Sequence, residues 1–291
     1  MKILETRSAG DPALADYRSL RDPARLRRGG TFLVEGREAV RVFLGSPGFA
    51  ARSILVTHAA LEALCEDFES AEELRDGETP VFLTPPEVLR EVTGFRFHQG
   101  CLAAGRLDSP ATTLRPADVT RIAARERPGS PLLILEDVTD PDNVGSVFRN
   151  AFALGAGGVL LTGGCASPLY RKSIRTSLGT VFRVPFCHDG SVADPVRQAV
   201  QAGFEPVALH PDAPGTDRST PLGHYAPRSA SPPAWIVGNE GRGLSREALE
   251  LAERIVSIEM EPEADSINVA AATAVALHAS RSDSKPGSIE P

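Results

Sequence analysis

The hydrophobic and polar positions of this chain follow two alternating patterns. Short apolar runs bounded by glycine or proline predict strands, and apolar residues spaced three and four positions apart predict helices. In the first third of the chain this predicts strands at 32–36, 53–57, 81–84 and 101–106, and helices at 37–44, 58–68 and 86–94. Such alternation is typical of an α/β fold with helices packed on a parallel or mixed sheet.

A second α/β series begins near residue 131. It predicts a helix within 144–155 and strands at 131–138, 158–163, 182–186, 205–209, 234–238 and 254–260. The stretch before it has proline, charge and only one short helical pattern. We therefore expect a smaller N-terminal α/β domain at 1–108, a linker at 109–130, a larger domain at 131–281 and a disordered tail at 282–291.

The amino-acid composition excludes some classes of protein but does not by itself indicate a function. The apolar fraction of 42% and charged fraction of 24% are ordinary for a globular protein. No apolar run is long enough to span a bilayer, and the N-terminus lacks a signal-peptide core, so we expect a cytoplasmic protein with no membrane partner. Four single cysteines have no zinc-ligand spacing, and we expect no metal.

Charge is distributed unevenly along the chain. The net charge is −7, which by itself argues against a nucleic-acid partner. Yet residues 18–28 carry five arginines against one aspartate, and residues 171–183 carry three arginines and a lysine with no acid. Two basic segments on an acidic protein fit a local anionic ligand such as phosphate, although a solvated helix face would give the same pattern.

Three segments combine glycine, asparagine and charge at the ends of predicted strands. DPDNVGSVFRNAFALG (140–155) opens a helix after a buried strand; Asp140 or Asp142 can cap that helix, and Asn143 and Arg149 can reach one site. GNEGRGLS (238–245) is a glycine loop whose spacing fits neither a dinucleotide-binding loop nor a Walker loop. SINVA (266–270) starts an alanine-rich helix, with Ser266 as a possible N-cap.

In this order the three segments resemble the signatures of the SpoU/TrmH family of RNA 2′-O-ribose methyltransferases, within the SPOUT superfamily. The match is strong over about 131–280 and weaker over the N-terminal region, where DYRSLRDPARLRRGGTFLVEG and FHQGCLAAG look like a substrate-binding extension. The resemblance implies a C-terminal methyltransferase domain with a trefoil knot, which is an exception to the rule against threaded chains. It also implies S-adenosylmethionine as the cofactor, RNA as the substrate and a homodimer with the active site near the subunit interface.

The resemblance assigns roles to particular positions of this chain. The expected catalytic residues are Asn143, Arg149, Glu240, Ser266 and Asn268. The expected cofactor-binding residues are Gly238, Asn239, Gly241, Ile258, Met260, Ile267 and Val269. From the basic segments we expect substrate RNA to contact Arg21, Arg25, Arg28, Arg171 and Arg175.

The chemistry of methyl transfer agrees with these roles. A ribose 2′-hydroxyl is a poor nucleophile, so its developing negative charge needs a proton acceptor or a cation. Arginine keeps its charge, which makes Arg149 a better oxyanion stabiliser than a base. The sequence departs from the family pattern at Glu261, where a small residue is usual, and at Ala270, where serine is frequent.

The substrate is left open among several alternatives. We expect the RNA to be 23S ribosomal RNA, by analogy with family members that have this kind of N-terminal unit. A transfer RNA substrate, an antibiotic-resistance role and a non-catalytic RNA-binding or ribosome-assembly protein are the alternatives. A nucleotide-dependent oxidoreductase is disfavoured by the glycine spacing.

Overall fold

The structure is a computed structural model, and it describes residues 1–18, 23–94, 99–210, 219–227, 231–261, 263–264 and 266–280. The chain divides into two compact units. Unit 1 comprises residues 1–114 and 167–183, and unit 2 comprises residues 115–166 and 184–291. The expected tail at 282–291 and Arg21 lie outside the described residues.

Unit 1 is built on a mixed sheet. Its described strands form a five-stranded sheet in the order β1-β4-β3-β5-β2. The strands are β1 (Lys2–Glu5), β2 (Thr31–Glu35), β3 (Ala51–Val56), β4 (Pro80–Leu83) and β5 (Cys101–Arg106). β1, β4 and β3 are parallel to one another, whereas β5 is antiparallel to both β3 and β2. Its α-helices are α1 (Ala15–Arg18), α2 (Pro23–Arg28), α3 (Arg37–Leu44), α4 (His58–Ala63), α5 (Cys65–Ser70), α6 (Glu72–Arg75), α7 (Pro86–Thr93) and α10 (Arg171–Thr176).

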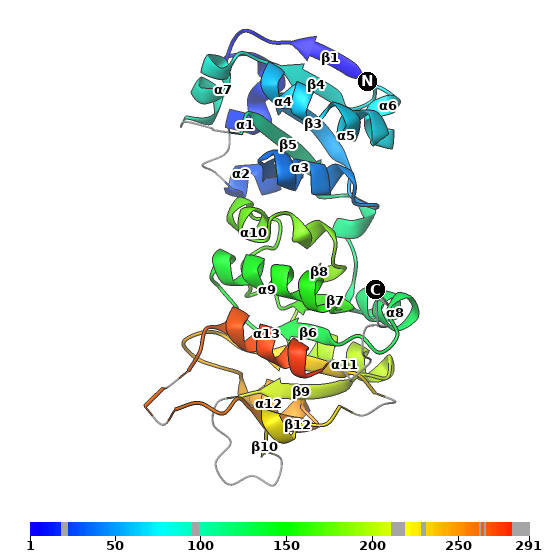
Figure 1. The fold of residues 1–291 in the computed structure, drawn as a ribbon, viewed down its shortest axis with the longest axis vertical. Helices are drawn as coiled ribbons and strands as arrows, with labels where there is room; N and C mark the ends of the chain where they lie inside the picture. The colour runs from blue at the N-terminus through cyan, green and yellow to red at the C-terminus, as the bar shows by residue number, and fades with distance from the viewer. Residues whose placement is uncertain are drawn as a thin grey trace, which may run out of the picture. The chain divides into compact units, whose positions relative to one another are not determined.

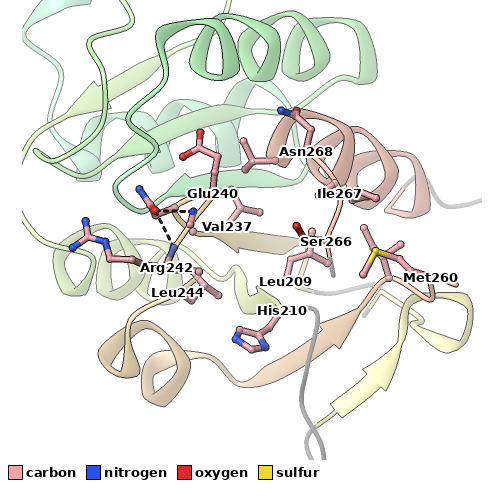
Figure 2. Close-up of a pocket in the computed structure, with 17 residues that line it drawn as sticks. Leu209, His210, Val237, Glu240, Arg242, Leu244, Met260, Ser266, Ile267 and Asn268 are labelled. Atoms are coloured by element: carbon pink, nitrogen blue, oxygen red, sulfur yellow. Dashed lines mark hydrogen bonds between the residues drawn. The ribbon is translucent and has the colours of Figure 1, made fainter. Parts of the chain in front are cut away.

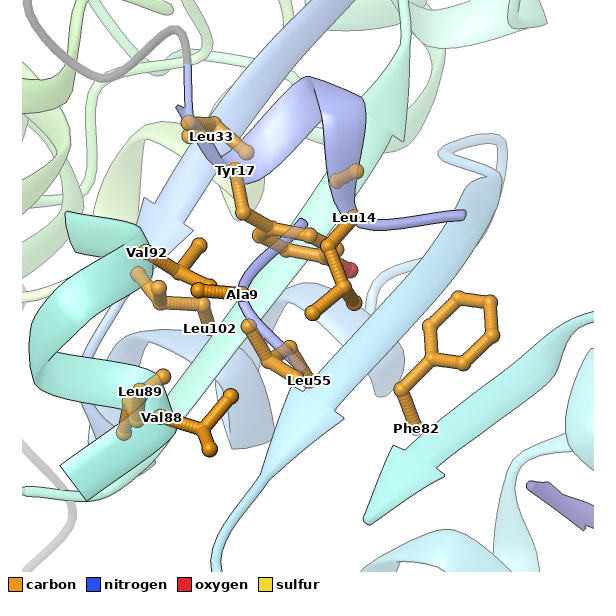
Figure 3. Close-up of a cluster of buried hydrophobic side chains, with 11 residues drawn as sticks. Ala9, Leu14, Tyr17, Leu33, Leu55, Phe82, Val88, Leu89, Val92 and Leu102 are labelled. Carbon is orange, nitrogen blue, oxygen red and sulfur yellow. The ribbon is translucent and has the colours of Figure 1, made fainter. Parts of the chain in front are cut away.

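The core of unit 1 joins the N-terminal residues to the sheet and to α7. Figure 3 shows Leu14 and Tyr17 packed with Leu55 and Leu102 in a cluster of buried apolar side chains. The Tyr17 hydroxyl shares a 2.8 Å hydrogen bond with Ser53 Oγ. Burial raises the pKa of the Tyr17 phenol far above its ordinary value, because the interior disfavours its charged form. The N-terminal residues around Leu14 and Tyr17 are therefore part of the folded unit.

Unit 2 is built on a parallel sheet (Figure 1). Its described strands form a seven-stranded sheet in the order β10-β12-β9-β11-β6-β7-β8. They are β6 (Leu132–Leu135), β7 (Gly158–Leu161), β8 (Phe186–His188), β9 (Glu205–Leu209), β10 (Ser219–Pro221), β11 (Pro233–Val237) and β12 (Arg254–Ser257). Every residue of β6, β7 and β11 is buried, as expected for parallel strands covered by helices.

The helices of unit 2 pack in two groups. They are α8 (Pro116–Glu126), α9 (Pro141–Leu154), α11 (Ala193–Gln201), α12 (Arg246–Leu251) and α13 (Val269–Ala279). α9 packs against α13, and α8 packs against α11 and against β7 and β8. Asp140 caps α9 by accepting a hydrogen bond from the Asp142 nitrogen at 2.9 Å, and Gly155 ends it in the left-handed region. No helix among the described residues is long and apolar enough to cross a membrane.

Most predicted elements are confirmed, and several differ. The predicted helix at 58–68 is divided into α4 and α5, and β10 lies in a stretch with no predicted strand. The stretch 109–130, expected as a linker, contains α8, whose buried face docks on the sheet of unit 2. The predicted strand at 182–186 is wrong: residues 180–182 form a 3-10 turn in unit 1, and the strand starts at Phe186. Phe182 is apolar because it packs with Phe32, Phe43 and Phe49, not because it lies in a strand. β1 was missed because its four residues are exposed.

Candidate functional site

A cavity of about 510 Å³ lies at the carboxyl edge of the parallel sheet in unit 2. Its walls come from the residues that follow β9, β11 and β12 and from the start of α13. Figure 2 shows Leu209, Val237 and Leu244 of these walls, with Met260 and Ile267 on the segment that leads into α13. In parallel α/β sheets this edge is where ligands bind, because the loops after neighbouring strands converge there.

The cavity gathers most of the predicted site. All seven predicted cofactor-binding residues line it, together with Glu240, Ser266 and Asn268. Asn143 and Arg149 do not line it. The sequence order of the three motifs therefore predicted one site, and the fold brings their loops together over three strand ends.

The glycine loop 238–245 is shaped by its own backbone. A Cβ atom at Gly238 would lie 2.6 Å from the Leu244 nitrogen and still closer to the Gly243 carbonyl group. The Gly243 nitrogen donates to the Asn239 carbonyl at 2.9 Å, and Gly243 has a φ of 68°, which favours glycine. The Asn239 side chain accepts hydrogen bonds from the nitrogens of Gly241 and Arg242 (Figure 2). Glycine at 238 thus allows the loop to close on itself.

Two acids at the end of β6 hold this loop. Glu136 is buried, and its carboxylate accepts hydrogen bonds from Ser245 N at 2.8 Å and from Ser245 Oγ at 2.6 Å. The Asp137 carbonyl accepts a 2.8 Å hydrogen bond from Asn239 Nδ2. Asp137 has a φ of 54°, a left-handed conformation that aspartate tolerates better than most residues. Both ends of the loop are therefore fixed to the neighbouring strand.

Sequence reasoning missed Glu136 and Asp137 as part of the site. The signal was present, because two acids directly follow the apolar run of β6. It also missed Leu209, His210 and Arg242, which line the cavity. A polar residue placed directly after a predicted parallel strand would have indicated His210, which follows β9.

Three polar side chains from the three motifs form a chain of hydrogen bonds. Asn143 Nδ2 donates to Glu240 Oε1 at 2.7 Å. Asn268 Nδ2 donates to Asn143 Oδ1 at 2.8 Å. The Asn268 oxygen accepts from the Ala270 nitrogen at 2.8 Å, so Asn268, and not Ser266, caps α13. Asn143 is thus joined to the cavity wall on two sides.

Arg149 lies further along α9, with an exposed side chain. One residue later, Asn150 Nδ2 donates to the Ala270 carbonyl at 2.7 Å and so fixes α9 against α13. Residues one apart on a helix point about 100° away from each other. Arg149 and Asn150 therefore occupy different parts of the helix surface, and Arg149 does not line the cavity of its own chain.

The predicted RNA-contacting arginines belong to unit 1. Arg25, Arg28 and Arg175 are exposed, whereas Arg171 is partly buried and its Nε lies 2.7 Å from Glu35 Oε2. The helices that carry them, α2 and α10, both pack against β2. The two basic segments, far apart in sequence, therefore pack against the same strand, although the sequence placed the second one in the larger domain.

The donor set of the cavity suits an organic ligand. Glycine backbone at 238, 241 and 243 lies beside apolar walls from Ile258, Met260 and Ile267. A Cβ atom at Gly238 would displace the loop that forms one wall. Among the described residues no group of three or more histidine, cysteine, aspartate and glutamate side chains is placed to hold a metal ion.

Comparisons with known proteins agree with this geometry. Residues 130–278 match the SpoU rRNA methylase family. An uncharacterized tRNA/rRNA methyltransferase of Mycobacterium tuberculosis is 32% identical over 273 residues, covering 92% of this chain and 88% of that protein.

Solved structures show the same fold. An AdoMet-bound rRNA methyltransferase from Sinorhizobium meliloti is 23% identical, with a TM-score of 0.76 over 96% of this chain and 97% of that one. The SpoU methyltransferase AviRb from Streptomyces viridochromogenes is 25% identical, with a TM-score of 0.71 over 93% and 96% of the two chains. Because the matched family segment contains the parallel sheet and the whole cavity, this chain belongs to the SpoU rRNA methylase family.

Proposed function

We propose that this protein transfers a methyl group from S-adenosylmethionine to a ribose 2′-hydroxyl of RNA, with 23S ribosomal RNA as the substrate. The observation that carries the proposal is the chain of hydrogen bonds from Glu240 through Asn143 to Asn268 at the rim of the cavity. It joins one residue from each motif beside a wall of glycine backbone. A cytoplasmic location follows from such a substrate.

S-adenosylmethionine would supply the methyl group as a sulfonium and would be held by the cavity residues. The glycine loop offers backbone groups to a polar ligand, and Leu209, Ile258 and Leu244 offer apolar surface. Glu136 and Asp137 keep the loop in one conformation, so little of the binding free energy is lost in ordering it.

The asparagines orient the ribose in this proposal. Asn143 has one amide hydrogen engaged by Glu240 and its oxygen engaged by Asn268, which fixes the plane of the amide. Its second amide hydrogen remains available to a ribose oxygen. Arg149 stabilises the charge that develops on the attacking 2′-oxygen, because an arginine cation keeps its charge at neutral pH.

We also propose a homodimer that completes this site. Phe152, three residues after Arg149 on α9, is 45% exposed, and Val275 on α13 is 42% exposed. α13 is apolar on nearly all sides, and a helix of that kind normally has its outer face covered. A second copy covering α9 and α13 would bury both residues and would surround Arg149 with protein.

The trefoil knot and the RNA-binding role of unit 1 belong to the same proposal. The knot is expected from the family resemblance, and an experimental structure traced through residues 238–280 would test it. RNA binding by unit 1 is supported by the basic helices α2 and α10, which both pack against β2. Arg171 is partly buried and pairs with Glu35, so it adds little free positive charge to the RNA-binding surface.

The test is methylation of defined RNAs with tritiated S-adenosylmethionine. We expect label in 23S rRNA transcripts and none in 16S rRNA or tRNA. A 2′-O-methyl group blocks alkaline cleavage at its nucleotide, so a gap in the alkaline ladder would map the target. Label in tRNA would replace the proposed substrate, and label on a nucleobase would contradict ribose methylation. An absence of transfer to any RNA, with RNA binding intact, would favour a non-catalytic RNA-binding protein.

A further inference from the structure

A second cavity, of about 490 Å³, lies in unit 1 at the carboxyl edge of its parallel strands. It is lined by residues 5–7 after β1, 57–59 after β3 and 83–86 after β4, with Glu62 from α4. Pockets of about 300–1,000 Å³ are typical of small-ligand sites. The methyl-transfer site described above lies in unit 2 and shares no residue with this cavity.

The wall of this cavity contains a buried hydroxyl without a partner. Thr84 is 2% exposed, and within the part of the chain that the structure describes its Oγ1 has no hydrogen-bond partner. Its neighbours across the strands are satisfied: Thr6 Oγ1 donates to Asp11 at 3.0 Å, and Thr57 Oγ1 lies 3.4 Å from the Gly100 carbonyl. Buried polar groups are nearly always hydrogen-bonded. The Thr84 hydroxyl has almost no exposed surface, so a ligand must press against the cavity wall at Thr84 to supply the missing hydrogen bond.

The polar side chains at the rim occur in two pairs. Arg7 Nη2 lies 3.2 Å from Glu5, and His58 Nε2 lies 3.4 Å from Glu62, with all four side chains largely exposed. Neither pair leaves a free cation for an isolated phosphate. The remaining surface comes from Leu83, Pro85 and Pro86, which present apolar surface beside the Thr84 hydroxyl. Paired side chains, apolar surface and one unpartnered hydroxyl in the wall favour a ligand without net charge that carries hydrogen-bonding groups.

We infer that this cavity holds an unpaired nucleobase of the substrate RNA. The inference rests on the proposed function, because it takes RNA as the ligand of unit 1. Sequence-specific proteins read RNA mainly through unstacked bases, which they pack on flat side chains and hydrogen-bond along their edges. The carboxylates of Glu5 and Glu62 can accept hydrogen bonds from an exocyclic amino group, which favours cytosine, adenine or guanine over uracil.

The experiment compares two tryptophan substitutions on one helix. Ala59 lines the cavity and Ala63, one turn later on α4, does not, and both are exposed, so either position should accept a large side chain without unfolding the protein. Binding of a short fluorescein-labelled oligocytidine to the full-length protein is measured by anisotropy. We expect Ala59→Trp to weaken binding at least about ten-fold by occupying the base site, and Ala63→Trp to leave it unchanged.

A second pair of variants tests the hydroxyl. Thr84→Val should weaken oligocytidine binding about three- to ten-fold, the effect of one lost hydrogen bond. Its unfolding midpoint should not fall, because no hydrogen bond inside the protein is lost. Thr79→Val is the control: Thr79 donates to the Ala51 carbonyl at 3.2 Å at the other end of β4, so this change should lower stability and leave RNA binding intact.

Each outcome decides between distinct conclusions. Equal RNA binding by Ala59→Trp and Ala63→Trp overturns the base site, and so does competition by inorganic phosphate as strong as that by cytidine monophosphate. Oligouridine binding as tight as oligocytidine would overturn the role of the carboxylates. Methylation of RNA by the wild-type protein is assayed in parallel. Its failure would count against the proposed function, whereas methylation with unaltered Ala59→Trp binding would count against the base site alone.

Discussion

The side-chain amide of Asn143 donates a 2.7 Å hydrogen bond to Glu240, a residue 97 positions further along the chain. The same amide accepts a 2.8 Å hydrogen bond from Asn268. Asn143 therefore presents its nitrogen to the glycine loop and its oxygen to the start of α13. The amide donates in one direction and accepts in the other, whereas a carboxylate can only accept and a hydrocarbon can do neither.

The first prediction concerns this amide. Asn143→Asp should slow single-turnover methyl transfer about 10²-fold, because a carboxylate would face the carboxylate of Glu240 and lose the donated hydrogen bond. The control is Asn150→Ala, seven positions later on the same helix, where the amide binds only the Ala270 carbonyl. That variant should lose about 1 kcal/mol of stability and keep its rate. Equal rates for the two variants would show that Asn143 is only structural.

The second prediction concerns Arg149. If its cation stabilises charge that develops in the transition state, Arg149→Ala should lower the rate about 10²–10³-fold and leave S-adenosylmethionine affinity nearly unchanged. Arg149→Lys should recover part of the loss, because lysine lacks the planar fork. Arg121→Ala on α8, another exposed arginine, serves as the control. Single-turnover assays decide the question: a rate above about a third of wild type for Arg149→Ala contradicts the mechanism.

The third prediction separates two glycines of one loop. Gly238→Val should abolish measurable S-adenosylmethionine binding in calorimetry, because its side chain would collide with the backbone of Gly243 and Leu244. Gly241→Ala should bind within about three-fold of wild type, since a Cβ atom there meets only Asn239 Oδ1 at 3.6 Å. If Gly238→Val bound S-adenosylmethionine with wild-type affinity, the glycine loop would not be part of the cofactor site.

The fourth prediction concerns assembly. Wild-type protein should sediment as a dimer with twice the 30.9 kDa mass of the chain. Phe152→Glu should shift it to the monomer, because a buried unpaired carboxylate is costly at an apolar interface. Val200→Glu is the matched control, since Val200 is 47% exposed on α11, outside the proposed interface. A single species of monomer mass for the wild type would end the dimer proposal.

The fifth prediction uses the cysteines to check the fold. Burial raises the pKa of the Cys187 thiol to about 11 and also raises the pKa of Cys101 and Cys165. The exposed Cys65 donates to Glu69 at 3.5 Å, and this hydrogen bond, with the glutamate charge, raises the pKa of its thiol. A raised pKa leaves less thiolate at a given pH, so labelling is slower.

Ellman's reagent at pH 8 should therefore react with one thiol per folded chain and with all four after denaturation. Glu69→Gln should label faster than wild type, because the carboxylate that holds the proton on Cys65 is gone. Cys65→Ser should show no reactive thiol in the folded state. More than one fast thiol in native wild-type protein would contradict the burial of the other three.

The sequence was sufficient wherever the determining interaction is local. The apolar runs of β6, β9 and β11 predicted buried parallel strands, and the spacing of 37–44 predicted a helix with those bounds. The second and third motifs predicted most of the cavity wall, because the carboxyl ends of parallel strands converge at one edge whatever the details of packing. The sequence analysis identified Gly238 as a cofactor-binding position. The structure adds that a Cβ atom there would collide with the backbone of the same loop.

Tertiary structure decided what depends on contacts between distant residues. The sequence could not show that Phe182 packs with Phe32 and that Arg171 pairs with Glu35, so the segment 167–183 folds with unit 1. It gave no sign that Thr84 keeps a free buried hydroxyl beside a cavity. Hydrophobic periodicity indicates which face of a helix or strand is buried. Which other element packs on that face depends on shape and charge across the whole chain. For that reason the elements and motifs could be derived from the sequence, whereas the composition of each unit and the position of Arg149 outside the cavity wall could not.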